Sequence, residues 1–334
     1  MYEVIRPIAA GHQGQVDLAR APDGSLVALK RLAVDGTLAE RDVARRRIRR
    51  EAELLRGVQI DGVIPLLDVI DELSDTGDPE LVLVMPYLPG GSLHDRVSAS
   101  GPLPAERLSE LAVPLLGALA ALHRRGIVHR DVKPSNVLFD AVEGRRPCLI
   151  DFGIGIARDF TAGLSSAAAM LGTPSFIAPE RARGEAATPA SDIYSLGATL
   201  RFAITGMPPH GVGDIVSVVG RAAAGRVEPL PPGTDPRVVE VLDHMCALDP
   251  ADRPTAAELL PGPEGSAVRG LPAPAAQVAD AAPVTRRRNR ALTTIGAAAL
   301  LVVGIATGVV AATQLGGDGE PGTTAAADTL DPAP

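Results

Sequence analysis

The fold of this chain is decided by two stretches, His129-Arg130-Asp131-Val132-Lys133-Pro134-Ser135-Asn136 and Asp151-Phe152-Gly153. The first places Asp131 two residues before a lysine and five residues before an asparagine, and the second adds another aspartate on a separate turn. Phosphoryl transfer from a metal nucleotide needs a carboxylate to orient the attacking hydroxyl, and oxygen ligands to hold Mg²⁺ against the phosphates. Both stretches in this order, with further signals around them, are hard to obtain by chance.

The composition fits one large or two modest domains. Of the 334 residues 46% are hydrophobic but only 2% are aromatic, so aliphatic side chains must form the core. The formal net charge of −8 argues against a general nucleic-acid-binding protein, and we expect no nucleic-acid partner. Cys148 and Cys246 fit neither a disulfide framework nor a metal site, and we expect both to be small buried side chains.

The apolar pattern changes along the chain. Residues 1 to about 90 contain short apolar runs between Gly, Pro and acidic residues, which predicts strands. One helix is expected among them, from about Glu40 to Arg56, because apolar residues recur there at helical spacing. These residues are Ile48, Ala52 and Leu55. From about Ser92 the segments become longer and helical, so the sequence predicts an α+β fold with a β-rich lobe before a larger helical lobe.

Six arginines crowd the outer side of this predicted helix: Arg41, Arg45, Arg46, Arg47, Arg49 and Arg50. A run of like charges on a helix usually forms a solvated face. The alternative is a receptor for a phosphorylated loop, since guanidinium groups bind phosphate well.

A candidate transmembrane helix lies near the C-terminal end, at residues 291–313. This uncharged stretch is long enough, at ~1.5 Å per residue, to cross a hydrocarbon core of ~30 Å. Residues 261–290 before it form a Pro- and Ala-rich linker that ends in a basic juxtamembrane cluster, and residues 314–334 after it are acidic. The positive-inside rule predicts a single-pass protein of the cell membrane, with the preceding residues cytoplasmic and the short tail outside. A buried Ala-rich soluble helix is the competing interpretation.

Two features of the N-terminal region are suited to binding phosphates. Residues 9–16 join two predicted strands, and glycines there allow a hairpin backbone to approach phosphates closely, although an ordinary hairpin turn is the alternative. Lys30 ends the next strand, and an acid on the following helix, Glu51 or the alternative Glu53, would aim its ammonium at the α- and β-phosphates. Glu51 is preferred because Leu55, one turn later, then lies on the same inward face.

These motifs, in their order and spacing, resemble those of bacterial, membrane-anchored, eukaryotic-like Ser/Thr protein kinases. The resemblance covers about residues 1 to 260 and also includes Ala178-Pro179-Glu180, Asp192 and Arg253. It implies a two-lobed protein-kinase fold, with an N-lobe over about residues 1–88 and a C-lobe over about 89–260. It also implies an ATP-dependent, non-specific protein serine/threonine kinase that uses Mg²⁺ or Mn²⁺ and phosphorylates itself and cytoplasmic proteins in signalling.

The resemblance assigns roles to the polar residues. Asp131 would orient the substrate hydroxyl and accept its proton, while Lys133 would neutralise the transferred phosphoryl group. Asn136 and Asp151 would hold the metal, and Lys30, paired with Glu51, would contact the phosphates. The glycine-loop residues against the phosphates would be Ala9, Ala10, Gly11 and Gly14, with Ala9 in place of the usual first glycine.

The resemblance also predicts the adenine site. Met85 would be the gatekeeper, and the hinge would run from Pro86 to Leu88, with adenine bonded to the Pro86 carbonyl and the Leu88 N–H. Proline lacks only a donor that this pairing does not use. The purine would lie between three apolar side chains, each of which alone would be consistent with plain core: Val16, Ala28 and Leu138.

The presumed activation segment runs from Asp151 to Glu180. A phosphate on one of its hydroxyls would bind Arg130 and order the loop. We expect autophosphorylation on Thr161, Ser165 or Ser166, and we expect Thr173 to contact Asp131 and Lys133.

Two structural contacts are also expected. Glu180 and Arg253 would form a buried ion pair, and Asp192 would accept hydrogen bonds from the backbone of the catalytic loop.

Two alternatives differ in function. A catalytically inactive kinase-fold membrane scaffold is disfavoured because Lys30, Asp131, Asn136 and Asp151 are all present. A small-molecule phosphotransferase is disfavoured by the complete activation segment, which would build a shelf for a protein substrate.

The predicted span also suggests a homodimer as a hypothesis. Gly304 and Gly308 are four residues apart, and glycines at this spacing let helices approach closely in lipid, although the pattern also arises easily by chance in so Ala- and Gly-rich a span.

Overall fold

The secondary structure follows the predicted order, with strands first and helices after them. The structure is a computed structural model that describes residues 2–11, 14–32, 38–57, 59–73, 79–140, 146–151 and 174–261. These residues belong to one compact unit that extends from Met1 to Gln277.

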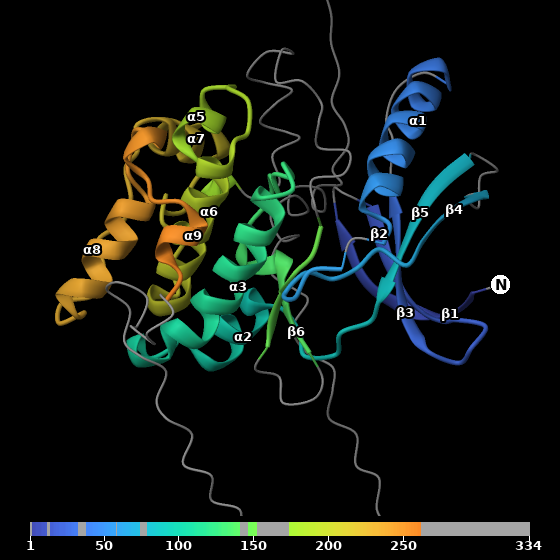
Figure 1. Ribbon diagram of the computed structural model, residues 1–334, viewed down its shortest axis with the longest axis horizontal. Coiled ribbons are helices and arrows are strands. Elements are labelled where there is room, and N and C mark those ends of the chain that lie inside the picture. Colours follow the sequence, from blue (N-terminus) through green and yellow to red (C-terminus); the bar gives the residue numbers. More distant parts are fainter. Residues whose placement is uncertain are drawn as a thin grey trace, which may run out of the picture. The chain divides into compact units, whose positions relative to one another are not determined.

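A five-stranded antiparallel sheet forms the first lobe (Figure 1). Its strands are β1 (Glu3–Gly11), β2 (Gly14–Arg20), β3 (Leu26–Leu32), β4 (Asp68–Leu73) and β5 (Pro79–Pro86), in the order β1-β2-β3-β5-β4. Because side chains alternate between the two faces of a strand, β5 buries Val82 and Val84 on one face and Leu81 and Leu83 on the other. The sheet therefore has apolar residues on both faces, as its short apolar runs predict.

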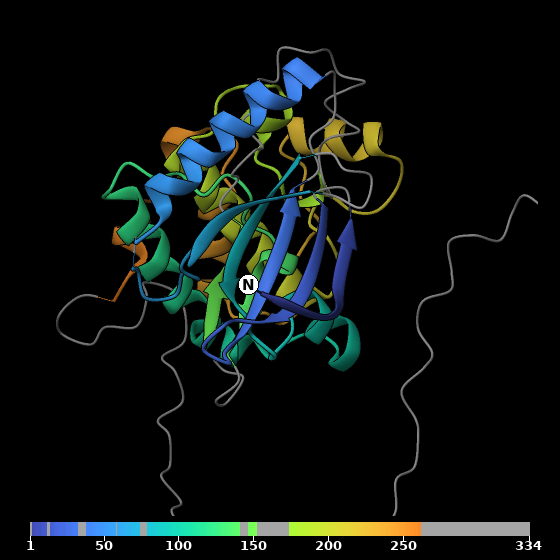
Figure 2. The ribbon, with the colours of Figure 1, turned by 90° about the vertical axis from the view of Figure 1, so that its right-hand side faces the viewer.

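The helix α1 (Leu38–Leu55) covers one of these faces (Figures 1 and 2). Ile48 and Ala52 are buried in one cluster with Leu83, which confirms the predicted helix and two of its three inward positions. The side chain of Leu55 lies outside the described residues.

The arginine run of α1 is partly used within the fold. Arg45 and Arg49 bind the Asp71 carboxylate of β4 at 3.2 and 2.5 Å, whereas the Arg46 side chain is 72% exposed. A solvated face thus accounts for only part of the run, since two of its arginines join the helix to the sheet.

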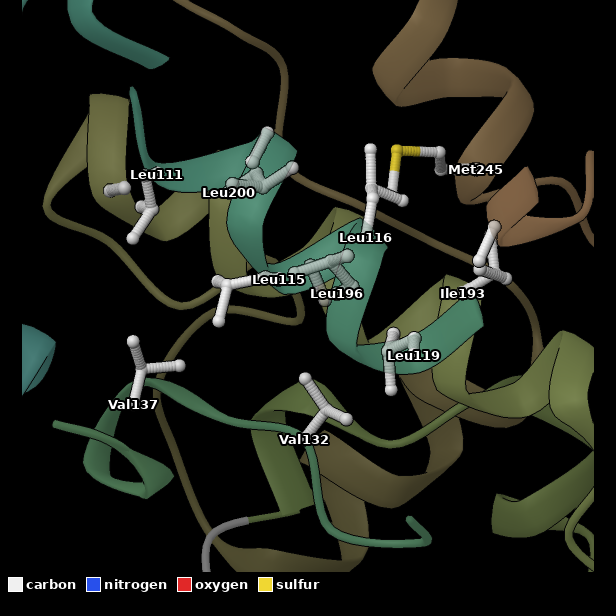
Figure 3. Close-up of a cluster of buried hydrophobic side chains, with 14 of the residues drawn as sticks. Leu111, Leu115, Leu116, Leu119, Val132, Val137, Ile193, Leu196, Leu200 and Met245 are labelled. Atoms are coloured by element: carbon white, nitrogen blue, oxygen red, sulfur yellow. The ribbon is translucent and has the colours of Figure 1, made fainter. Parts of the chain in front are cut away.

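The second lobe is helical, as predicted. Its helices are α2 (Leu93–Ser100), α3 (Leu108–His123), α5 (Pro179–Ala182), α6 (Pro189–Thr205), α7 (Ile215–Ala223), α8 (Pro236–Met245) and α9 (Ala256–Leu259). Short 3₁₀ turns are η1 (Ala105–Arg107), η2 (Pro134–Asn136), η3 (Pro174–Phe176) and η4 (Pro250–Asp252). The core lies between α3 and α6 and is mainly aliphatic (Figure 3), with Leu115, Leu119 and Leu196 fully buried. Aliphatic side chains therefore do most of the packing in a chain with only 2% aromatic residues.

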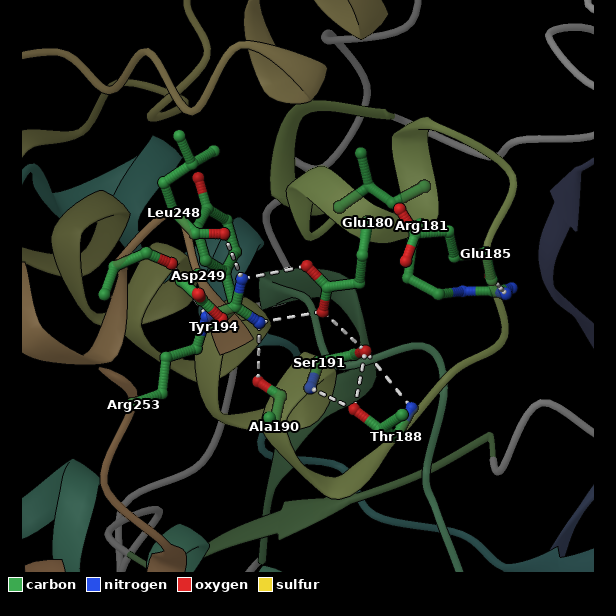
Figure 4. A network of polar contacts seen from close by, with 12 residues as sticks. Glu180, Arg181, Glu185, Thr188, Ala190, Ser191, Tyr194, Leu248, Asp249 and Arg253 are labelled. Atoms are coloured by element: carbon green, nitrogen blue, oxygen red, sulfur yellow. Dashed lines mark hydrogen bonds and ion pairs between the residues drawn. The ribbon is translucent and has the colours of Figure 1, made fainter. Parts of the chain in front are cut away.

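The ion pair between Glu180 and Arg253 is buried in this lobe (Figure 4), as predicted. The Arg253 guanidinium donates two parallel hydrogen bonds to the Glu180 carboxylate, at 2.7 and 2.8 Å, and the Ser191 hydroxyl donates a third at 2.7 Å. Burial alone would raise the pKa of Glu180, but these hydrogen bonds outweigh it and hold the pKa below its ordinary value. The carboxylate therefore stays ionised in the interior.

The two cysteines differ in burial. Cys246 is buried, and burial raises the pKa of its thiol to about 12, so it is a small apolar side chain as predicted. Cys148 is only half-buried, which corrects that prediction. Cys148 lies opposite Leu138 in the β6–β7 pair, and the Leu138 side chain is also half-buried. This face of the two strands is therefore partly exposed to solvent.

The predicted membrane span falls outside the described residues. Among the helices of the described ranges, none is long and apolar enough to cross a bilayer. Apart from Pro261, the predicted linker, span and tail (residues 261–290, 291–313 and 314–334) lie outside those ranges.

Replacing Arg253 by Met should destabilise the protein by about 3–5 kcal/mol, because it leaves the Glu180 charge buried without its cation. The matched control is Arg237→Met, which removes an exposed pair with Asp235 and should cost far less, because solvent screens that pair. Urea unfolding of the two variants and the parent measures both losses. Similar losses would contradict the importance of the buried pair.

Candidate active site

A short hairpin brings the two predicted metal ligands together. Strands β6 (Val137–Phe139) and β7 (Pro147–Leu149) pair with Val137 opposite Leu149, and the Ile150 N–H donates to the Asn136 carbonyl at 3.0 Å. Asn136 therefore lies beside the residue that precedes Asp151. The register of one hairpin thus places an amide and a carboxylate, distant in sequence, at the same end of two strands.

The predicted catalytic residues also cluster. The Asp131 carboxylate accepts hydrogen bonds from the Lys133 ammonium and the Asn136 side-chain amide, both at 2.8 Å. Val132 between them is only 2% exposed and points into the core of the helical lobe (Figure 3). Burial of Val132 leaves its neighbours Asp131 and Lys133 half-buried on the open side of the loop.

Two residues of the site have backbone conformations that side chains disfavour. Arg130 has a φ of 72° and Asp151 a φ of 57°, in the left-handed region. Such conformations cost about 1–3 kcal/mol each and persist only where surrounding contacts enforce them. They occur at the residue beside Asp131 and at a predicted metal ligand, as expected for a functional site.

Asp192 provides the enforcing contact for the first of these, as predicted. Its buried carboxylate, in the first turn of α6, accepts the backbone N–H groups of His129 at 2.8 Å and Arg130 at 2.9 Å. The helix begins at a capping box between Thr188 and Ser191, with proline at its first position, so Asp192 is held by local sequence signals.

Sequence reasoning missed a third partner of this carboxylate. The Nε2 of His123, the last residue of α3, lies 2.9 Å from Asp192 Oδ2. A lone histidine at a helix end carries no motif, so only the packing of α3 against α6 reveals its position.

Lys30 and the predicted purine-contacting residues share one face of the sheet. Lys30 lies opposite Val16 on β2 and Leu83 on β5, and Ala28 lies opposite Met85. Val16, Ala28 and Met85 are half-buried, as is Leu138 of β6, which fits walls of an open cleft better than plain core. Lys30 itself reaches the other lobe, since its ammonium lies 2.6 Å from the Asp151 carboxylate.

The acid predicted to pair with Lys30 is only partly described. The side chain of Glu51 lies outside the described residues. Glu53, the alternative, is 56% exposed and lies 3.9 Å from Arg49, so it is poorly placed to reach the buried Lys30. The position of Glu53 therefore favours Glu51 indirectly.

The hinge has the polarity that adenine needs. The Tyr87 N–H donates to the Leu26 carbonyl of β3 at 3.2 Å. Because the C=O and N–H of a trans peptide point in opposite directions, the Pro86 carbonyl points away from β3. The strand β5 ends at Pro86, so the Leu88 N–H that is predicted to bind adenine lies beyond it. Pro86 therefore provides the predicted acceptor without losing a bond to the sheet.

A small pocket lies beside this face of the sheet. Its lining residues are Lys30, Leu32, Ile64, Leu66, Leu83, Met85 and Asp151. The pocket is apolar apart from the Lys30–Asp151 pair, and the predicted purine-contacting residues Val16, Ala28 and Leu138 are not part of its lining. Met85, the predicted gatekeeper, is part of this lining.

The metal donors expected here are oxygen atoms. Within the described ranges, no group of three or more His, Cys, Asp and Glu side chains could hold a metal ion. Asp151 and Asn136 provide a carboxylate and an amide oxygen, because the Asn136 amide nitrogen is directed at Asp131. One or two oxygen ligands, completed by phosphates and water, suit Mg²⁺ or Mn²⁺.

The predicted glycine loop is partly described. Gly11 pairs with Gly14 across the β1–β2 hairpin, and Gly14 has a φ of 113°, which favours glycine. Ala9 is exposed opposite Val16, and Ala10 continues the strand β1. His12 and Gln13 lie outside the described residues, as do all four hydroxyl residues predicted for the activation segment, Thr161, Ser165, Ser166 and Thr173.

His129 is the most deeply buried titratable group of the catalytic loop. Burial lowers the pKa of its imidazole, although the nearby carboxylates, Asp192 first among them, oppose this shift. The neutral ring accepts the Asp131 N–H on its Nδ1 at 3.3 Å. Neutral His129 therefore contributes to the geometry of the loop.

Comparison with known proteins gives consistent matches. A family model described as "Protein kinase domain" matches residues 2–263. The chain is 36% identical to the probable serine/threonine-protein kinase PkwA of Thermomonospora curvata over 266 residues, 78% of this chain and 33% of PkwA. It is 36% identical to the serine/threonine-protein kinase AfsK of Streptomyces griseus over 303 residues, 86% of this chain and 35% of AfsK.

A third relative is the serine/threonine-protein kinase PknB of Mycobacterium tuberculosis, which is 34% identical over 268 residues, 77% of this chain and 41% of PknB. The chain thus spans about a third to two fifths of the length of these curated relatives.

Acidification should destabilise the protein, because the unfolded chain binds a proton on His129 below pH about 6.5 while the native protein does not until its lower pKa is reached. The contribution of His129 to the free energy of unfolding should not change with pH above about 7. Below pH about 7 this contribution should fall by up to about 1.4 kcal/mol per pH unit. In His129→Asn, whose side-chain oxygen keeps an acceptor for Asp131, the fall should be smaller. His94→Asn, at an exposed histidine, is the control and should resemble the parent. An unchanged slope in His129→Asn would contradict the prediction.

Proposed function

The chain belongs to the protein kinase family, and we propose from this premise that it transfers the γ-phosphoryl group of ATP to Ser and Thr hydroxyls of proteins, itself included. One observation carries the proposal. The β6–β7 hairpin and the Asp192 contact bring Asp131, Lys133 and Asn136 into one cluster, next to the Asp151 that Lys30 of the other lobe contacts. The names of its relatives favour Ser and Thr as acceptors.

Each cluster member has a chemical role in this proposal. Asp131 would accept a hydrogen bond from the substrate hydroxyl, align its oxygen and take its proton. Lys133, 2.8 Å from Asp131, would shift its ammonium to the phosphoryl group as charge develops there. Bound Mg²⁺ would supply charge neutralisation for the phosphates, held by the Asn136 and Asp151 oxygens.

Lys30 would position the nucleotide. It is only 8% exposed and lies 2.6 Å from the Asp151 carboxylate, so its cation is fixed next to the expected metal position. The walls of the purine site would be the half-buried Val16, Ala28 and Leu138, with the hinge backbone at Pro86 and Leu88 bonded to the adenine edge.

Activation by autophosphorylation is a further part of the proposal. Arg130 is exposed beside the catalytic aspartate. The pKa of Arg181 is lowered first by burial and then by the nearby charge of Arg130, so these two guanidinium groups lie close enough to repel each other. A phosphate on the activation segment would relieve this repulsion, which supports Arg130 as its docking residue.

An inactive membrane scaffold is the alternative function. It would need no intact phosphate or metal ligands, yet Lys30, Asp131, Asn136 and Asp151 are all present. Lys30 contacts Asp151, and Asn136 contacts Asp131. A parent protein that incorporates no phosphate would be the result expected of the scaffold.

Asp131→Asn should reduce autophosphorylation by a factor of at least ~10², because the amide cannot take the proton of the hydroxyl. Incorporation of radiolabel from ATP and Mg²⁺ into the purified protein measures the effect. Asp252→Asn, at an exposed turn residue of the helical lobe, is the control and should label like the parent. An unlabelled parent would support the scaffold, and equal labelling of parent and Asp131→Asn would refute the mechanism.

We also propose that residues 291–313 anchor the protein in the cell membrane, on the sequence argument of length, apolarity and basic flank. Protease added outside intact cells should then remove only the tail at residues 314–334, detected by an epitope at the C-terminus. Digestion of the catalytic region from outside would overturn the proposed orientation, and a fully protected tail would overturn the span.

A further inference from the structure

His210 lies in the turn between α6 and α7, outside the site described above, and it is only 1% exposed. Its Nδ1 lies 2.8 Å from the Arg226 carbonyl and its Nε2 lies 3.1 Å from the Ile177 carbonyl. The ring also stacks on Tyr194 of α6, with 5.9 Å between centroids and 16° between planes. One side chain therefore bridges three segments of the helical lobe.

The Ile177 carbonyl belongs to the segment on which a protein substrate would lie. We call residues 174–179 the substrate shelf, since they join the activation segment to α5. Glu180 and Arg253 fix the shelf where it ends. Inside the shelf, the Ile177 N–H donates to the Pro174 carbonyl. The Ile177 carbonyl is contacted by Nε2 of His210.

His210 is itself held rigidly. Its backbone carbonyl accepts a hydrogen bond from the Arg221 guanidinium of α7 at 2.6 Å, and the preceding Pro209 carbonyl accepts the Glu228 N–H at 2.7 Å. The turn thus cannot move without α7, which packs against both η3 and α5. Because these contacts hold the His210 backbone, its imidazole has a fixed position next to the substrate shelf.

The ring chemistry defines what can replace it. Burial lowers the pKa of His210, so at neutral pH the imidazole has one N–H. Carbonyl oxygens only accept, so the neutral ring donates either from Nε2 to Ile177 or from Nδ1 to Arg226. In the second tautomer Nε2 could only accept, from the Tyr194 hydroxyl 3.5 Å away. A plain core role would need the ring, its stacking on Tyr194 and the Nδ1 contact with Arg226, but no donor to Ile177.

We propose that His210 is a positioning residue for protein substrates, which acts by donating from Nε2 to the Ile177 carbonyl and so fixing the substrate shelf. The proposal deepens the proposed function, because it names a residue that governs recognition of the protein substrate and leaves nucleotide binding untouched. It predicts that the nitrogen atom matters in addition to the shape of the ring.

Three variants separate the two nitrogens from the ring. His210→Gln keeps a donor near the Nε2 position, His210→Asn keeps one near Nδ1, and His210→Phe keeps the ring shape and stacking without a donor. The acceptor is a synthetic peptide of residues 152–173, which contains Thr161, Ser165, Ser166 and Thr173. The KM for this peptide should rise about 3- to 10-fold in the Asn and Phe variants, as for the loss of one hydrogen bond, and less in the Gln variant. The KM for ATP and the kcat should stay at the parent values.

Hydrogen exchange over the shelf amides, Ser175 to Ala178, tests the anchor without catalysis. Exchange should be faster in the Asn and Phe variants and close to the parent in the Gln variant. Equal peptide KM values, or equal losses in Gln and Phe, would overturn the role of Nε2 and leave His210 as core. A parent that transfers no phosphate would refute the proposed function, and the exchange rates would then still decide whether His210 anchors the shelf.

Discussion

The buried Asp192 carboxylate is the contact on which the geometry of the site depends. Arg130 has a left-handed backbone that an arginine does not favour, and the carboxylate offsets that cost by accepting the N–H groups of Arg130 and His129. The same carboxylate is reached by His123 from the end of α3. Asp131 follows Arg130 directly, so its direction is set by a charge in the core of the helical lobe.

Backbone register then completes the site at little further cost. Pairing of Val137 with Leu149 brings Asn136 next to the residue before Asp151, and burial of Val132 turns its neighbours Asp131 and Lys133 outward. The alternation of β2, β3 and β5 likewise puts Val16, Lys30 and Met85 on one face. Apart from Asp131, which depends on Asp192, these side chains are thus positioned mainly by backbone register and by alternation along their strands.

This explains which features could be predicted from the sequence. Strand and helix periodicity predicted the two lobes and the inward face of α1. The resemblance to Ser/Thr protein kinases predicted the contacts of Asp192 and the Glu180–Arg253 pair. His123 and His210 could not be predicted, since each is a lone histidine whose partners come from distant segments. The contact of Lys30 with Asp151 depends on how the two lobes meet, which no local pattern encodes.

The meeting of the lobes is itself fixed by backbone hydrogen bonds. Leu149 donates to the Gly62 carbonyl at 2.8 Å and accepts from the Ile64 N–H at 3.0 Å, so the segment between α1 and β4 pairs with β7. Gly62 has a φ of 78°, and a Cβ there would lie 3.2 Å from the Pro114 carbonyl of α3, so a side chain would be strained in conformation and crowded in space. The ladder ends two residues before Asp151. Residues 62–64 are therefore joined through the backbone of β7 to the start of the segment that holds Asp151, which Lys30 contacts from the sheet.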